Sequence, residues 1–255
     1  MLKAIASIAS ITSIILLNPT NISAQTQDFN TNSYQKNTNS SLIAQTMPRL
    51  RFKLPDRGVP GARIGGATRS GDKSTVVTAI IPPEKLALTI DDSPTIFVYL
   101  PKNDAFDATV KVVDENGKEI YTKNFTPPNE AGVLRVKLPA NINLEEKKLY
   151  KWEIQLISED DNPLTAFKLR TVGWLEKVSL PEEMQQEITT DKEWDSLNTL
   201  AEAGIWYDTL EGLALLRAEN PQDNQIKKEW VELLNSVGLD SIAEIAIFPE
   251  VVQIN

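Results

Sequence analysis

The spacing of apolar residues changes at Pro181. Before it, between residues 75 and 172, short runs alternate apolar and polar side chains, a period typical of strands with one buried face. After it, apolar residues recur every three or four positions, which is typical of amphipathic helices. The change predicts an α+β chain organised by segments, in which a β-rich part precedes a helical part.

Seven runs before Pro181 have the length and alternation of strands. They span residues 75–81, 95–100, 108–113, 118–125, 133–138, 149–157 and 166–172. The pair Asn116-Gly117, between the third and fourth runs, is a strong hairpin signal. In the sixth run, Trp152 falls on the apolar face and is expected in the core. We predict an antiparallel, immunoglobulin-like β-sandwich over residues 48–178, although the Cys pair of the immunoglobulin family is missing.

Four helices are predicted after Pro181. They span residues 182–188, 191–203, 208–219 and 225–237. Gly204 and Gly238 end the second and fourth helices and lie 34 residues apart, the period of tetratricopeptide repeats. Thr209 departs from the small residue usual in that repeat, and only about one and a half units fit. We predict a helical hairpin or short bundle over residues 181–248 that is tetratricopeptide-like, with a chance coincidence of the glycines as the alternative.

The chain has no His and no Cys. Imidazole acid–base pairs, thiol nucleophiles, zinc sites with N or S ligands and disulfides are therefore excluded. Acidic pairs such as Asp91-Asp92 stand at turns or helix starts, where acids are common for structural reasons. We expect no catalytic residues, no metal and no cofactor, and thus no enzyme. A hydrolase built on two carboxylates stays open as an alternative.

The first residues have the pattern of an export signal. Lys3 precedes an uncharged, mostly apolar run at 4–17, and Ala24 offers a small residue for cleavage. We predict a signal peptide over residues 1–24, with an uncleaved anchor as the alternative. Residues 25–47 are rich in Asn, Thr, Gln and Ser and are predicted to be a disordered linker. The protein is then exported, periplasmic or extracellular, with no membrane span after signal removal.

Charge is unevenly distributed along the chain. The formal net charge of −9 excludes nucleic acid as a main partner, because phosphate binding needs an excess of Lys and Arg. Residues 48–73 carry seven basic and two acidic side chains, whereas residues 176–255 carry five basic and seventeen acidic ones. This polarity predicts electrostatic docking, either of the basic arm on the acidic part or of each on a partner. An ordinary solvated surface is the alternative.

Two groups of residues are candidates for contact with a partner. The first belongs to a Gly- and Arg-rich stretch, where guanidinium groups and backbone amides can hold an anion. Its candidate residues are Arg63, Gly65, Gly66, Thr68 and Arg69. The second is Trp206 with Tyr207, beside the predicted turn at Gly204. The alternatives are a tight loop at the start of the sandwich for the first group and core packing for the second.

Several of these segments together resemble a family of uncharacterised exported cyanobacterial proteins, the domain of unknown function number nine hundred and twenty-eight. The resembling segments, within residues 55–245, are Pro60 to Arg69, Trp152 in its run, Ala203 to Asp208, and Trp230 with Leu234 and Gly238. The family has no established activity, so the resemblance implies an architecture and a compartment. We expect a non-enzymatic, exported protein-interaction module whose unknown protein partner lies in the cell envelope. A cell-envelope or glycan-binding domain is the alternative.

Overall fold

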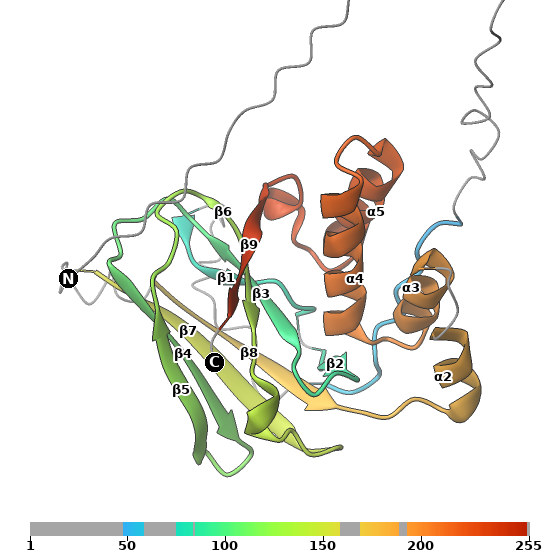
Figure 1. Cartoon of the computed structure of the whole chain (residues 1–255), viewed down its shortest axis with the longest axis horizontal. Helices are drawn as coiled ribbons and strands as arrows, with labels where there is room; N and C mark the ends of the chain where they lie inside the picture. The colour runs from blue at the N-terminus through green and yellow to red at the C-terminus, as the bar shows by residue number, and fades with distance from the viewer. Residues whose placement is uncertain (1–47, 59–74, 84, 159–168, 189–192, 254–255) are drawn as a thin grey trace, which may run out of the picture. The chain divides into compact units, whose positions relative to one another are not determined.

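Two open β-sheets and four α-helices form the part of the chain that the structure describes (Figure 1). The computed structural model describes residues 48–58, 75–83, 85–158, 169–188 and 193–253. One sheet has the strand order β1-β3-β6-β9, and the other has the order β2-β8-β7-β4-β5. The strands are β1 (Thr78–Ala79), β2 (Ala87–Thr89), β3 (Thr95–Leu100), β4 (Asp107–Asp114), β5 (Glu119–Phe125), β6 (Gly132–Lys137), β7 (Leu149–Ile157), β8 (Arg170–Lys177) and β9 (Ile247–Gln253). The predicted α+β class is confirmed.

The four-stranded sheet is built around β3, which is apolar apart from Thr95 and is buried along its whole length. β3 pairs antiparallel with β6, so that Leu100 lies opposite Gly132. β9 lies parallel to β6 at the edge of the sheet. The ring of Phe248 in β9 covers Gly132, where a Cβ atom would come within 2.4 Å of that ring. Glycine at this position therefore lets β9 approach β6 closely.

The five-stranded sheet has β7 at its centre. Trp152 of β7 is fully buried, as expected. The β4–β5 hairpin turns at Asn116-Gly117, and Gly117 has a φ of +79°, a left-handed conformation that favours glycine. The carboxylate of Asp114 accepts hydrogen bonds from the backbone N–H groups of Asn116 and Lys118, both at 2.9 Å. The hairpin predicted from the Asn-Gly pair is therefore present.

Two strand pairs differ from the predicted antiparallel arrangement. β2 lies parallel to β8, and β9 lies parallel to β6, so both sheets are mixed and the expectation of purely antiparallel pairing is wrong. Neither β2 nor β9 belongs to the seven predicted strands. The seventh predicted run, 166–172, overlaps β8 at residues 170–172, and its residues 166–168 lie outside the described residues. A parallel partner reaches its neighbour through a long crossover, so a local pattern carries no signal for it.

The four helices begin after β8. They are α2 (Glu182–Ile188), α3 (Glu193–Glu202), α4 (Trp206–Glu219) and α5 (Asn224–Ser236). Gly204 after α3 and Gly238 after α5 have φ angles of +76° and +71°, as predicted for glycines that end helices. After each glycine, the next residue donates its N–H to the carbonyl five positions earlier, at 3.0 Å in both cases. Asp223 caps α5 by accepting hydrogen bonds from the N–H groups of Gln225 and Ile226.

The helices share one hydrophobic core with the sheets. Buried side chains such as Leu210 of α4 and Leu234 of α5 belong to the same cluster as Phe97 of β3 and Ile154 of β7. All described residues fall within one compact unit, Thr46–Asn255. In this part of the chain, no helix combines the length and the apolar character that a membrane crossing requires.

Residues 48–58, which we call the strap, lie against the helices although they precede every strand in the sequence. The N–H of Lys53 donates to the carbonyl of Ala201 in α3 at 3.0 Å. The ring of Phe52 packs edge-on against Trp206 at the start of α4, with the centroids 5.0 Å apart. The strap, which is the N-terminal end of the described chain, therefore packs against α3 and α4.

Candidate functional site

The first group of predicted contact residues is Arg63, Gly65, Gly66, Thr68 and Arg69, and it lies outside the residues that the structure describes. The predicted signal peptide and linker, at residues 1–47, also lie outside them. An anion site at the Gly- and Arg-rich stretch therefore stays a prediction.

The second group, Trp206 with Tyr207, is buried, with exposed fractions of 0% and 1%. The indole N–H of Trp206 donates to the carbonyl of Ile80, after β1, at 2.9 Å. The hydroxyl of Tyr207 accepts a hydrogen bond from Trp152 of β7 at 2.7 Å and donates to the carbonyl of Trp174 in β8 at 2.9 Å. Burial raises the pKa of the Tyr207 phenol far above its usual value. In this structure the two side chains tie α4 to the sheets and do not reach the surface.

The described part of the basic arm contacts acidic residues of the same chain. Arg49 of the strap pairs with Glu232 of α5 at 2.7 Å. Arg57 pairs with Glu176 of β8, which is fully buried. The first pair is partly exposed and contributes little stability, whereas the second places a neutralising charge beside a buried carboxylate. Two of the four basic side chains in residues 48–58 thus pair with acidic residues of the same chain.

An apolar groove lies between α3 and α4, and the end of α2 contributes to it. Its volume is about 310 Å³, and its apolar lining residues are Ile188, Leu197, Leu200, Leu215 and Leu216. Leu215 is 47% exposed, so part of the apolar lining is open to solvent. At Gly212 of α4, a Cβ atom would come within 2.9 Å of Leu197. Glycine at this position therefore lets Leu197 of α3 pack closely against α4.

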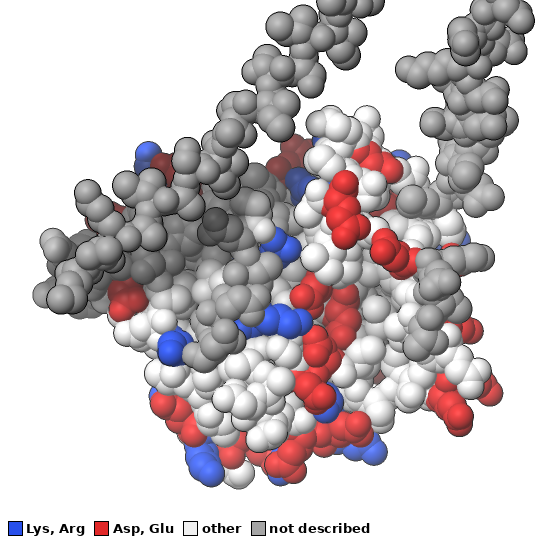
Figure 2. Space-filling view, viewed as in Figure 1, with Lys and Arg blue, Asp and Glu red and all other residues white. Residues whose placement is uncertain are grey.

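The surface around this groove is acidic. Glu193 and Glu219 belong to its lining and are exposed. Figure 2 shows further acidic side chains along the part of the surface that α2 to α5 form. An apolar groove with an acidic rim is complementary to a segment that carries both apolar and basic side chains.

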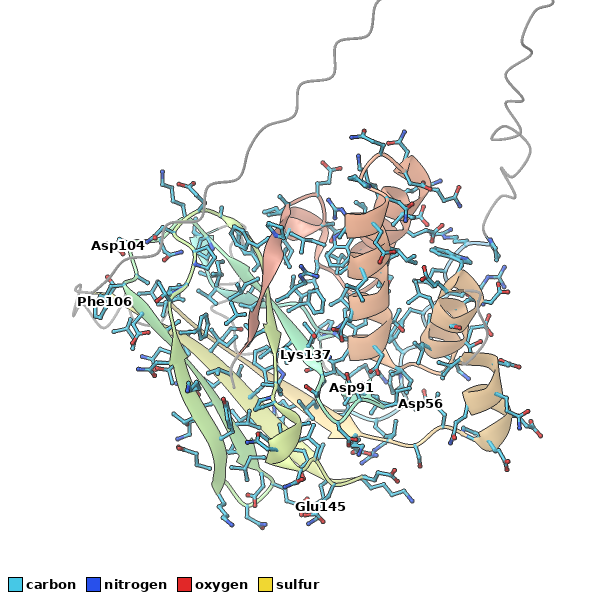
Figure 3. All side chains as sticks on the ribbon, in the orientation of Figure 1. Asp56, Asp91, Asp104, Phe106, Lys137 and Glu145 are labelled. Carbon is cyan, nitrogen blue, oxygen red and sulfur yellow. The ribbon has the colours of Figure 1, made fainter. Side chains whose placement is uncertain are left out.

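Charged groups also gather where the ends of β3 and β6 meet α4. Lys137 donates hydrogen bonds to Asp91 at 2.9 Å and to Glu211 at 3.3 Å, and Thr95 donates to Glu211 at 2.6 Å. Figure 3 shows the side chains of Asp91 and Lys137 next to each other. Burial alone would raise the pKa of Asp91, but the bonds from Lys137 and from the N–H of Ser93 lower it overall. The charges are therefore satisfied within the cluster.

Asp208, in the first turn of α4, lies beside this cluster. Burial raises its pKa to about 6, although hydrogen bonds from Thr89 and from the N–H of Ile90 act in the opposite direction. The bond from Ile90 measures 3.3 Å. The pKa values of Asp91 and Asp208 are thus shifted in opposite directions, as in some pairs of catalytic acids. Here both carboxylates accept hydrogen bonds from groups of the same chain.

Sequence reasoning missed the groove. The sequence pattern placed Leu215 and Gly212 in a helix. The exposure of Leu215 and the contact of Gly212 with Leu197 depend on the position of α3, which the pattern does not give. In the described residues, no three His, Cys, Asp or Glu side chains gather as a metal site would require.

A comparison with known families adds an identification to this geometry. A family model described as a domain of unknown function, DUF928, matches residues 64–247, more than two thirds of the chain. This range contains strands β1 to β8 and all four helices. No curated protein matches the sequence. The chain therefore belongs to the DUF928 family.

Proposed function

We propose that this protein is a non-enzymatic, exported interaction module that binds a protein partner through the groove between α3 and α4. The partner contributes a basic segment whose apolar side chains enter the groove. The observation that carries the proposal is the exposure of Leu215 beside an apolar groove on an acidic surface.

Apolar contact supplies the affinity in this proposal. A volume of about 310 Å³ holds a few side chains of an amphipathic segment, the usual occupant of a groove between helices. Covering Leu215 removes apolar surface from water, which favours binding.

The acidic rim supplies selectivity. Glu193 and Glu219 would attract Lys and Arg and repel acidic segments, so binding should weaken as the salt concentration rises. A basic apolar segment should therefore bind more tightly than an uncharged apolar segment.

The helical hairpin supports a tetratricopeptide-like interpretation, which we keep as part of the proposal. Gly204 and Gly238 share a left-handed conformation and the same hydrogen-bond pattern at the spacing of that repeat. Likewise, an immunoglobulin-like sandwich is the proposed relation of the two sheets, because side chains of both belong to one core. Repeats of this kind present surfaces for peptides, in agreement with the proposed groove.

The state of the carboxylates supports a non-enzymatic role. A hydrolase based on two carboxylates requires both groups to face a substrate in an open cleft. Asp91 is held by Lys137, and Asp208 by Ile90 and Thr89. The bonds of Asp208 join α4 to the end of β2, and the bond of Asp91 joins the segment after β2 to β6.

The test uses three labelled synthetic peptides and fluorescence anisotropy. One is a basic amphipathic helix, the second has the same apolar face with acidic residues, and the third is the basic peptide in scrambled order. We expect saturable, salt-sensitive binding of the first peptide only. Leu215→Ser should weaken it about tenfold, because the apolar surface covered by a buried leucine is lost.

Phe106→Ser is the matched control, since Phe106 is 59% exposed and lies just before β4 (Figure 3). It should bind the basic peptide as the natural chain does. Equal binding of the acidic peptide, equal loss in both variants, or no binding by the natural chain would overturn the groove as the interaction site.

Export rests on the residue pattern at positions 1–24 and has its own test. The protein is isolated from the medium, the envelope and the cytoplasm of its host, and its N-terminal sequence is determined. A chain that begins at Gln25 outside the cytoplasm supports export. A chain that keeps residues 1–24 and stays in the cytoplasm contradicts it.

A further inference from the structure

A second hollow lies among α4, α5, β6 and β9, and three basic side chains line it. They are Arg135 of β6, Arg217 of α4 and Lys227 of α5, and the hollow has a volume of about 350 Å³. Ala214 and Phe248 belong to its apolar lining. The C-terminal elements α4, α5 and β9 therefore meet β6, which is distant in sequence, and three cations line one apolar hollow.

These cations have no carboxylate partner among the described residues. Arg135 is 5% exposed and donates from Nη2 to the carbonyls of Phe248 and Pro249, but its buried Nε has no acceptor. Nη1 of Arg217 is also buried without an acceptor, and its guanidinium lies 5.6 Å from the centre of the Trp230 ring. Buried N–H groups without acceptors are costly, so a bound acceptor would stabilise this arrangement.

Electrostatics favours a negative ligand in the same hollow. Burial lowers the pKa of both Arg135 and Arg217, because it disfavours their charged forms, and the negative charge of Glu211 only partly opposes this for Arg135. Lys227 adds a third positive charge to the lining. An anion would relieve both the desolvation of the guanidinium groups and the repulsion among the three cations.

We propose that this hollow, which we call the arginine pocket, binds an organic oxyanion, a carboxylate or a phosphate monoester, that carries a short apolar tail. Guanidinium groups present paired N–H donors that match such oxyanions. The tail lies against Ala214 and Phe248. The volume is at the lower end of the range of small-molecule pockets, about 300–1,000 Å³. This site is separate from the α3–α4 groove and goes beyond the proposed function.

The experiment titrates the full chain, by isothermal calorimetry, with hexanoate, hexyl phosphate and the neutral analogue hexanol. We expect one site per chain for an anionic probe and binding of hexanol at least about tenfold weaker, because hexanol cannot pair with the cations. The Nε–H resonance of Arg135, assigned with Arg135→Lys, should shift on addition of the anion. The tighter of the two anions identifies the headgroup.

Adjacent lysines give a matched pair of variants. Lys227→Gln removes a charge from the arginine pocket, whereas Lys228→Gln removes one that is exposed and faces Glu232 at 3.8 Å. Lys227→Gln and Arg217→Gln should each weaken binding about tenfold, while Lys228→Gln leaves it unchanged. Hexanol binding equal to that of the anions, equal losses in the two lysine variants, or no saturable binding by the natural chain would overturn the proposal. If Arg217→Gln fails to fold, the comparison of Lys227→Gln with Lys228→Gln still tests the proposal.

Discussion

At the scale of single residues, contacts of glycine with aromatic rings limit what the sheets tolerate. At Gly173 of β8, a Cβ atom would lie 2.2 Å from Cζ2 of Trp152. We expect Gly173→Ala to lower the free energy of unfolding by about 1–3 kcal/mol through overpacking, measured by urea denaturation. In a Trp152→Phe background, which lacks that part of the ring, the same substitution should cost less. An equal cost in both backgrounds would show that the clash is not the cause.

Asp208 should make stability depend on pH. Its folded pKa of about 6 exceeds the unfolded value of about 3.9, so its stabilising contribution is complete below pH 4 and is lost as pH rises through 6. Between pH 4 and 7, the natural chain should lose about 2–3 kcal/mol relative to Asp208→Asn. Urea denaturation of both proteins at the two pH values measures the difference, and a constant difference would contradict it.

Asp91 provides a control of opposite sign. Lys137 and the N–H of Ser93 outweigh the effect of burial and lower the pKa of Asp91. Its contribution is therefore present above the unfolded pKa and is lost as pH falls through the folded value. Relative to Asp91→Asn, the natural chain should lose stability on acidification below pH 4, opposite in direction to the Asp208 comparison.

At the scale of elements, the contact of Phe52 with Trp206 should contribute to the stability that the strap gives the helices. Phe52 packs on Trp206, whereas Leu54, two residues further along, is 38% exposed. Phe52→Ala should lower the free energy of unfolding by about 2–3 kcal/mol, and Leu54→Ala should change it by less than about 0.5 kcal/mol. Chemical denaturation measures both. Similar small effects of the two substitutions would show that the contact between Phe52 and Trp206 adds little stability.

Most elements could be predicted because their signals are local. Alternation and turn residues located β3 to β7, and helix-ending glycines located α3 and α5. β9 was not predicted, because it contains Pro249 and follows the helices. Its pairing with β6 depends on the whole fold. β2 has three residues, too few for a period to be visible.

The candidate sites were less predictable than the elements that form them. The arginine pocket joins Arg135, Arg217 and Lys227, whose spacing in the sequence has no pattern. The groove depends on which face of α4 the sheets leave uncovered. Trp206 and Tyr207 were singled out for their position beside Gly204, but the pattern could not show whether they face the core or a partner. Three-dimensional packing decides each of these points.

At the scale of the whole molecule, sheets and helices should unfold together. α4 and α5 share a core with both sheets, and β9 returns to β6 after the helices. We expect one transition in urea, with the same midpoint for the backbone amide NMR signals of α4 and of β7. Phe248→Ala, which uncovers Gly132, should lower both midpoints equally. Loss of the α4 signals before those of β7 would show two independent units.

The position of β9 also sets an order of events during synthesis. β6 leaves the ribosome long before β9 does, because more than a hundred residues separate them. Until residue 247 has been translated, the edge of β6 has no partner on that side, and unpaired edges promote aggregation. A nascent chain arrested after α5 should therefore need a chaperone, whereas the released chain that contains β9 can complete its four-stranded sheet.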